Sequence, residues 1–121
     1  MKKIEVITLF KKDIKDFARE RNLVLRQAKA EWVLFIDSDE TISKGLEKEL
    51  EELELNDYNG FYLKRRNYFC GEFVGEDKIL RLAKKDVGKW VRRVHETWQI
   101  KGNVGELTNP IIHNTAENLS D

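Results

Sequence analysis

The hydrophobic pattern of the first half alternates between strand-like and helix-like segments. Residues 4–9 are a short run rich in β-branched side chains, which is typical of a strand. Residues 13–28 place apolar side chains three and four positions apart and predict an amphipathic helix. Residues 31–37 are apolar without alternation, so we expect a central strand covered on both faces in a parallel or mixed sheet. Residues 44–53 predict a second helix, with Ser43 as its N-cap.

From residue 60 the helical period ends and strand-like patterns dominate. Residues 61–69 and 78–83 predict strands. Five glycines mark expected bends, namely Gly71, Gly75, Gly88, Gly102 and Gly105. Because the chain has no internal repeat or linker, we expect one domain over residues 1–121. The predicted fold class is α/β, a mixed sheet with two main helices followed by a β-rich C-terminal half.

Composition narrows the function classes. Of 121 residues, 22 are Lys or Arg and 22 are Asp or Glu, so no basic excess favours nucleic acid or an anionic membrane. The single cysteine, Cys70, excludes an internal disulfide and an all-cysteine zinc site. The longest apolar run, residues 32–36, is too short to span a bilayer, and we expect a soluble, cytoplasmic protein. Residues 60–101 are locally basic and could line a cleft for an anionic ligand.

An acidic motif directly follows the predicted central strand. Asp37 and Asp39 stand two positions apart, so in an extended chain both carboxylates point to one side. Open α/β sheets bind ligands beyond the carboxyl ends of their strands, and Mg²⁺ prefers carboxylate oxygen together with substrate phosphate. The motif therefore indicates a metal-assisted phosphate site, although an acidic loop that only ends a strand fits the pattern equally well. Ile42 and Lys48 stand where an EF-hand needs Gly and Glu, which excludes that motif.

Three further residues carry possible chemistry in the C-terminal half. His95 and His113 each follow apolar residues, and each is either a metal ligand or an ordinary packed histidine. Glu96 could act as a general base if burial raised its pKa, or it could be an ion-paired surface carboxylate. The sequence alone leaves these alternatives open.

Basic side chains raise two more questions. Arg21 falls on the apolar stripe of the first helix, with Asn22 at its edge, and a guanidinium there needs a partner. That partner is a structural carboxylate or carbonyl, a substrate, or the acidic loop itself. Residues 64–69 mix basic and aromatic side chains, but at neutral overall charge we expect an exposed or cleft-lining strand rather than a nucleic-acid surface.

Together these residues resemble one known family. In the order of the chain, the sequence is similar to family 2 glycosyltransferases, especially the branch that includes lipopolysaccharide-core glucosyltransferases. The resemblance covers about residues 4–113. The motifs that carry it are Asp16-Phe17-Ala18-Arg19-Glu20-Arg21-Asn22, residues 30–40 with Asp37-Ser38-Asp39-Glu40, Arg81-Leu82, Trp90, Val94-His95-Glu96 and Ile112-His113.

The resemblance implies a GT-A-like fold and a defined reaction. A hexose would pass from a nucleoside-diphosphate sugar, such as a UDP-hexose, to a hydroxyl of a saccharide or lipid-linked saccharide acceptor. By motif, Asp37, Asp39 and His113 would hold Mg²⁺ or Mn²⁺ against the donor diphosphate, and Glu96 would be the base of an inverting displacement. The weaker candidates for donor or loop contacts are Arg21, Asn22, Glu40 and Arg81.

The sequence departs from the family at its start. Family members begin with a strand-helix-strand-helix unit that supplies much of the nucleotide pocket, and this sequence starts after it. The resemblance therefore implies a partial, truncated Rossmann-like GT-A domain with an exposed sheet edge, which a homodimer or a partner chain would cover. The alternative function is a non-catalytic glycosyltransferase-like module that dimerises through that edge.

Overall fold

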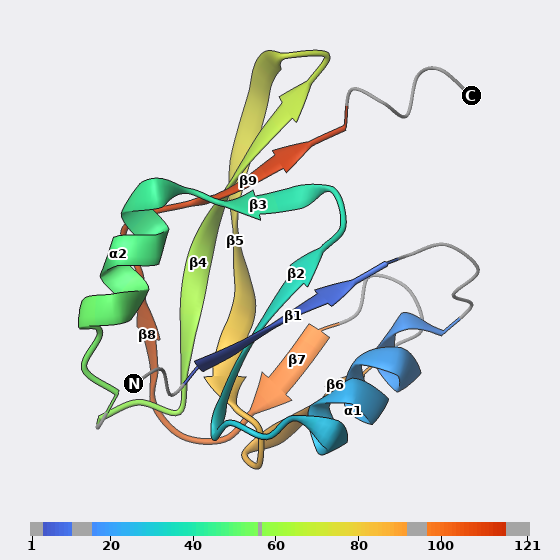
Figure 1. The fold of residues 1–121 in the computed structure, drawn as a ribbon, viewed down its shortest axis with the longest axis vertical. Helices are drawn as coiled ribbons and strands as arrows, with labels where there is room; N and C mark the ends of the chain where they lie inside the picture. The colour runs from blue at the N-terminus through green and yellow to red at the C-terminus, as the bar shows by residue number, and fades with distance from the viewer. Residues whose placement is uncertain (1–3, 11–15, 56, 92–96, 116–121) are drawn as a thin grey trace.

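Two helices lie against a mixed β-sheet in the computed structural model (Figure 1), which describes residues 4–10, 16–55, 57–91 and 97–115. The order of elements confirms the expected α/β class, with both helices in the first half of the chain. The elements are β1 (Ile4–Leu9), α1 (Phe17–Gln27), β2 (Trp32–Asp37), β3 (Glu40–Ile42), α2 (Lys44–Glu52), β4 (Gly60–Phe69), β5 (Glu72–Lys84), β6 (Gly88–Val91), β7 (Thr97–Ile100), β8 (Val104–Glu106) and β9 (Ile111–Asn114).

The larger sheet has the strand order β1-β2-β5-β4-β9-β3, and β8 joins it by pairing with β4. β1 and β2 are parallel, as a strand-helix-strand unit requires, and β6 and β7 form a separate two-stranded sheet. The expectation that β2 would be the central strand is wrong, because it lies second in the order, next to β1. It is still buried along its whole length, since other elements pack on both of its faces.

The side chains of β2 alternate between two cores. Trp32, Leu34 and Ile36 point to the face that α2 covers, where Leu46 of that helix is fully buried. Val33 and Phe35 point to the opposite face, which is covered by α1 and the β6-β7 pair. By the same alternation, Asp37 at the end of β2 turns toward α1. The strand register therefore directs the first carboxylate of the acidic motif to the α1 side of the sheet.

Capping defines where the two helices begin. Asp16 is the N-cap of α1 and accepts a hydrogen bond from Arg19 N (3.1 Å), and residues 13–15 of the predicted helix lie outside the described residues. Ser43 caps α2 as predicted, with its hydroxyl oxygen accepting from Leu46 N (3.1 Å). In the parts of the chain that the structure describes, no helix is long and apolar enough to cross a membrane.

β4 and β5 form a long hairpin that projects from the sheet (Figure 1). Its turn passes through Cys70 and Gly71, both with positive φ, as two-residue hairpin turns favour. Three of the glycines expected at bends lie instead in strands: Gly75 in β5, Gly88 in β6 and Gly105 in β8. The pattern misled because glycine in a strand also serves close backbone approach, and a Cβ at Gly88 would lie 1.8 Å from the carbonyl oxygen of Gln99.

The short strand β3 was not predicted from the sequence. It runs antiparallel to β9 and sets Glu40 opposite His113. Only three residues long, it carries no periodic signal of its own, and its pairing depends on a strand some 70 residues later. This pairing brings the C-terminal histidine against the acidic motif.

Glu49 ties α2 to the segment before β9, and its removal is expected to weaken the fold. Its carboxylate accepts hydrogen bonds from Thr108 N (2.9 Å), Asn109 N (2.9 Å) and Asn109 Nδ2 (3.0 Å). Partial burial raises the pKa of Glu49, but these hydrogen bonds outweigh it, so its pKa lies below the ordinary value of 4.5. Since the side chain is partly exposed, Glu49→Ala should lower the free energy of unfolding by about 1–2 kcal/mol at neutral pH.

Urea unfolding at several pH values checks this expectation. A carboxylate with a lowered pKa in the fold contributes stability above its unfolded pKa, and that contribution is lost as pH falls through the folded pKa. The gap between wild type and Glu49→Ala should therefore close on acidification below about pH 4.5. Glu51→Ala, on the exposed side of the same helix, is the matched control and should change stability by less than about 0.5 kcal/mol. Equal losses in the two variants contradict the role of Glu49.

Candidate functional site

The acidic motif forms the tight connection between β2 and β3. Asp37 is the last residue of β2 and is 2% exposed, whereas Glu40 is the first residue of β3 and is 5% exposed. Ser38 and Asp39 make the turn between them, and Ser38 N donates to Leu9 O (3.1 Å) at the end of β1. The motif thus lies at the carboxyl ends of two parallel strands, where open α/β sheets bind their ligands.

Two arginines bind the carboxylate of Asp37. Arg21 Nη2 of α1 donates to Asp37 Oδ1 (2.6 Å), and Arg81 Nη2 of β5 donates to Asp37 Oδ2 (3.3 Å). The guanidinium of Arg21 also lies over the rings of Trp90 (4.6 Å to the centroid) and Phe35 (5.5 Å). The arginine on the apolar stripe of α1 therefore has the acidic motif as a partner, one of the alternatives that the sequence left open.

Glu40 fastens the other end of the motif. Its carboxylate accepts from the backbone N of Asp37 (2.8 Å), from Arg81 Nη1 (2.8 Å) and from Arg65 Nη1 (3.2 Å). Arg65 in turn donates to Asp77 through Nε (3.2 Å) and Nη2 (2.7 Å), and these hydrogen bonds hold the pKa of Asp77 below its usual range. Among the described residues, this network joins three arginines (Arg21, Arg65, Arg81) to three carboxylates (Asp37, Glu40, Asp77).

Asp39 makes none of these contacts and faces a histidine instead. His113 Nε2 is 3.0 Å from Asp39 Oδ2, and His113 Nδ1 is 2.8 Å from Asn67 Oδ1. The other carboxylate oxygen, Asp39 Oδ1, is buried and has no hydrogen-bond partner among the residues described. A buried carboxylate oxygen without a donor is costly unless a ligand or ion satisfies it. Asp39 is therefore the carboxylate of the motif that is available to a ligand.

The three proposed metal ligands differ in how well they fit a cation. Within the described part of the chain, no group of three or more His, Cys, Asp and Glu side chains could hold a metal ion. Asp39 and His113 do offer one oxygen and one nitrogen to a common point, and Mg²⁺ is often held by one or two carboxylates plus substrate phosphates. Both oxygens of Asp37, by contrast, are engaged by arginines. The pair Asp39 and His113 fits a divalent cation whose remaining ligands come from substrate and water.

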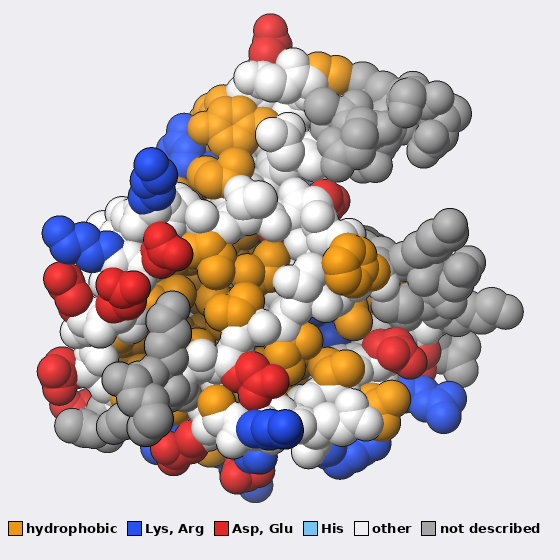
Figure 2. Space-filling model, in the orientation of Figure 1, with side chains coloured by type: hydrophobic (Ala, Val, Ile, Leu, Met, Phe, Trp, Pro, Cys, Tyr) orange, Lys and Arg blue, Asp and Glu red, His pale blue; other side chains and the backbone are white. Residues whose placement is uncertain are grey.

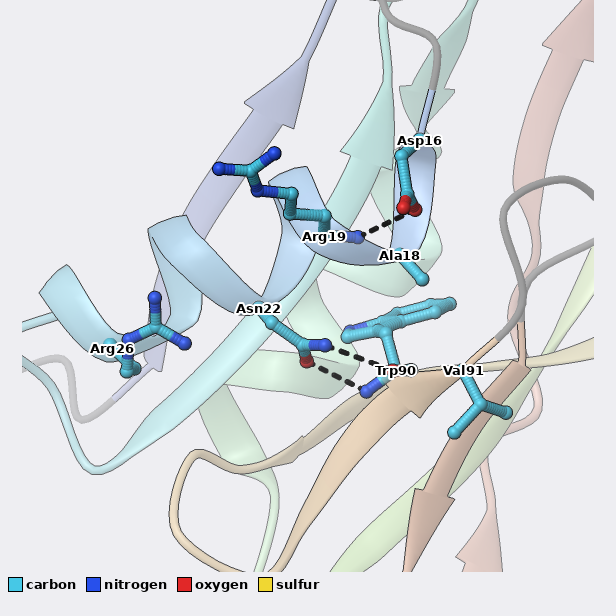
Figure 3. Close-up of a pocket in the computed structure, with 7 residues that line it drawn as sticks. All are labelled: Asp16, Ala18, Arg19, Asn22, Arg26, Trp90 and Val91. Carbon is cyan, nitrogen blue, oxygen red and sulfur yellow. Dashed lines mark hydrogen bonds between the residues drawn. The ribbon is translucent and has the colours of Figure 1, made fainter.

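Asn22 lies on α1 but bonds away from the acidic motif. Figure 3 shows its amide paired with the backbone of Trp90, donating to Trp90 O (2.9 Å) and accepting from Trp90 N (2.8 Å). These bonds fasten β6 to α1 beside a shallow cavity of about 400 Å³. Its lining includes two exposed arginines on one side of the helix, Arg19 and Arg26 (Figure 3). Of the four weaker candidates for donor contacts, Asn22 thus binds the backbone of Trp90 in β6. The other three, Arg21, Glu40 and Arg81, make hydrogen bonds within or to the acidic motif.

Some candidates cannot be placed, and some residues of the site were missed. His95 and Glu96, the candidate base, lie outside the described residues. The residues that sequence reasoning missed are Arg65, Asn67 and Asp77, which lie on the β4-β5 hairpin. The available signal was the period of two in residues 64–69, which places residues 65 and 67 on one face of the strand.

Comparison with known proteins agrees with this geometry. The family model of Glycosyl transferase family 2 matches residues 1–109, which is most of the chain. A search of curated proteins finds no match to the chain. The fold, with its strand-helix-strand start and an acidic motif after β2, is consistent with a GT-A-like domain. On the strength of the family match, the chain belongs to glycosyl transferase family 2.

Proposed function

We propose that the chain binds a nucleoside-diphosphate hexose together with Mg²⁺ or Mn²⁺ and transfers the hexose, with inversion, to an acceptor hydroxyl. The observation that carries this proposal is the pair Asp39 and His113, with a buried carboxylate oxygen that has no hydrogen-bond partner in the described part of the chain. Its family implies nucleotide-sugar donors, and family members often use divalent metals. A saccharide or lipid-linked saccharide, as in lipopolysaccharide-core assembly, is the acceptor we propose.

Different residues of the chain would have different roles in such a site. A bound divalent cation would stabilise the negative charge of the departing diphosphate. Asp39 and His113 would hold that cation, while Arg21, Arg81 and Glu40 keep the turn at a fixed position so that Asp39 need not reorganise on binding. Glu96, which lies outside the described residues, is the proposed base that takes the proton of the acceptor hydroxyl.

Titration calorimetry tests the donor site. UDP and UDP-glucose are titrated into the chain with and without Mn²⁺, and we expect binding that depends on the metal. Asp39→Asn removes a charged metal ligand, so Mn²⁺ should no longer increase the affinity for UDP or UDP-glucose in this variant. Circular dichroism should show that the variant is folded. Asp57→Asn, in an exposed turn, is the matched control and should bind like wild type. Metal-independent binding, or none by a folded protein at millimolar ligand, contradicts the proposal.

One observation favours the non-catalytic alternative. The sheet ends at β1, whose outer edge has no strand partner among the described residues, and two apolar side chains near it are exposed: Val6 (46%) and Phe10 (68%). Figure 2 shows hydrophobic side chains gathered in the middle of the visible face, over the strands between the two helices. Such an edge can pair with a second copy or a partner chain. A stable dimer in light scattering, with no nucleotide affinity, would favour that function.

A further inference from the structure

Asn67 lies in a row of residues that crosses the sheet to the acidic motif. It stands opposite Gly75 of β5 and opposite His113 of β9, and His113 stands opposite Glu40 of β3. A register shift between β4 and β5 follows Asn67 directly, at Tyr68. Such bulges re-aim side chains and are common beside functional sites. The row therefore connects the hairpin to the Asp39-His113 pair.

The surroundings of Asn67 fix which way its amide points. Its Nδ2 faces three acceptors: Asp77 Oδ1 (3.2 Å), Arg65 O (3.4 Å) and Gly75 O (3.4 Å). The reversed amide would place its oxygen against all three, so the hydrogen-bond network assigns Nδ2 to this side. Arg65 holds the Asp77 carboxylate in place with two hydrogen bonds. Asn67 Oδ1 is thereby directed at His113 as an acceptor.

This orientation determines which ring nitrogen of His113 donates to Asn67. Because Asn67 Oδ1 accepts, His113 Nδ1 is the nitrogen that carries the hydrogen (2.8 Å). In a neutral imidazole the lone pair then lies on Nε2, and that nitrogen faces Asp39 Oδ2 at 3.0 Å. An oxygen and a nitrogen at this distance can occupy adjacent positions on one divalent cation, because Mg²⁺ binds its ligands at about 2.0–2.1 Å in octahedral geometry. In metal sites, an acceptor on the far nitrogen commonly fixes the ring of a ligating histidine in this way.

We propose that Asn67 is a positioning residue, which sets the His113 ring with Nδ1 as donor and Nε2 toward Asp39 so that the two bind a divalent cation together. This role rests on the proposed function, since it concerns the same metal. Asn67 itself touches neither metal nor donor, and acts through the histidine. The Arg65-Asp77 pair supports it from the hairpin by fixing the Asn67 amide.

The test combines a spectroscopic signature with metal affinity. The ¹⁵N shifts of the two histidine rings of the chain are recorded without metal at about pH 8.5, where imidazole in water is neutral. A His113→Gln spectrum assigns the signals. We expect the Nδ1–H form of His113 in wild type and its loss in Asn67→Ala and in Asn67→Leu, the latter close to asparagine in size. Mn²⁺ affinity, measured by titration in the presence of UDP, should fall about 10–100-fold in both variants.

The controls separate this role from a general effect on folding. Asn114→Ala removes an exposed asparagine next to His113 and should leave both the ring form and the Mn²⁺ affinity unchanged. An unaltered His113 ring form, or unaltered Mn²⁺ affinity, in the Asn67 variants overturns the positioning role while the proposed function stands. If wild type binds no Mn²⁺ even with UDP present, the proposed metal site itself fails, and the positioning role falls with it.

Discussion

Replacing Asp37 by alanine is expected to lower the free energy of unfolding by about 3–5 kcal/mol. The carboxylate is 2% exposed and accepts hydrogen bonds from Arg21 and Arg81, which are 1% and 7% exposed. Removing it takes one negative partner from each of the two buried guanidinium groups, while Arg81 keeps its contacts with Glu40, and weaker compensation of a buried charge is costly. The whole free energy of unfolding of a small domain is only about 5–15 kcal/mol, so a loss of this size is a large share of it.

Asp39→Ala is the matched comparison, two positions away in the same motif. Asp39 has one carboxylate oxygen with no hydrogen-bond partner in the described part of the chain, and the other faces only His113. We therefore expect a change in stability of no more than about 1 kcal/mol. Urea unfolding followed by circular dichroism measures both variants, and Asp37→Asn adds a test of charge at nearly constant shape. Similar stabilities for the Asp37 and Asp39 variants would show that the arginine network does not depend on Asp37.

The sequence predicted those strands and helices whose formation depends mainly on neighbouring residues. The strand at residues 4–9 coincides with β1, and the unbroken apolar run before Asp37 coincides with β2. Ser43 caps α2 because a hydroxyl at that position satisfies a free backbone N–H of the first turn. The position of β2 in the sheet could not be predicted in this way, because it depends on which distant strand pairs with its other edge, and that strand is β5.

The sequence also located the acidic motif but not the different surroundings of its carboxylates. Alternation along a strand places Asp37 and Asp39 on one side, and this favoured a shared metal. The structure surrounds them differently, because α1 and β5 bring two arginines to Asp37, while β9 brings His113 to Asp39. Those contacts span 16 to 74 residues of sequence separation, and no local pattern encodes them.

Trp98→Ala should be as destabilising as the loss of Asp37, at about 3–5 kcal/mol. Trp98 is 1% exposed, stacks on Trp90 with ring centroids 5.2 Å apart, and meets Phe35 edge-on at 5.3 Å. Truncation would leave a large cavity in the core between α1 and the sheet. It would also loosen the packing of Trp90, over whose ring the Arg21 guanidinium lies. The hydrogen bond from Arg21 to Asp37 should therefore weaken as well.

Trp98→Phe and a surface control make this expectation sharp. The Trp98 indole nitrogen is buried and has no hydrogen-bond partner within the described residues, so phenylalanine sacrifices packing alone and should cost less than alanine. Phe73→Ala, on the hairpin at 50% exposure, should cost less than about 1 kcal/mol although its ring contacts Arg66. Urea unfolding ranks the three variants, and near-ultraviolet circular dichroism reports the Trp90-Trp98 stack. If Trp98→Ala proves no more costly than Phe73→Ala, the β6-β7 pair does not stabilise α1, and the Arg21-Asp37 contact must be held in place by other packing.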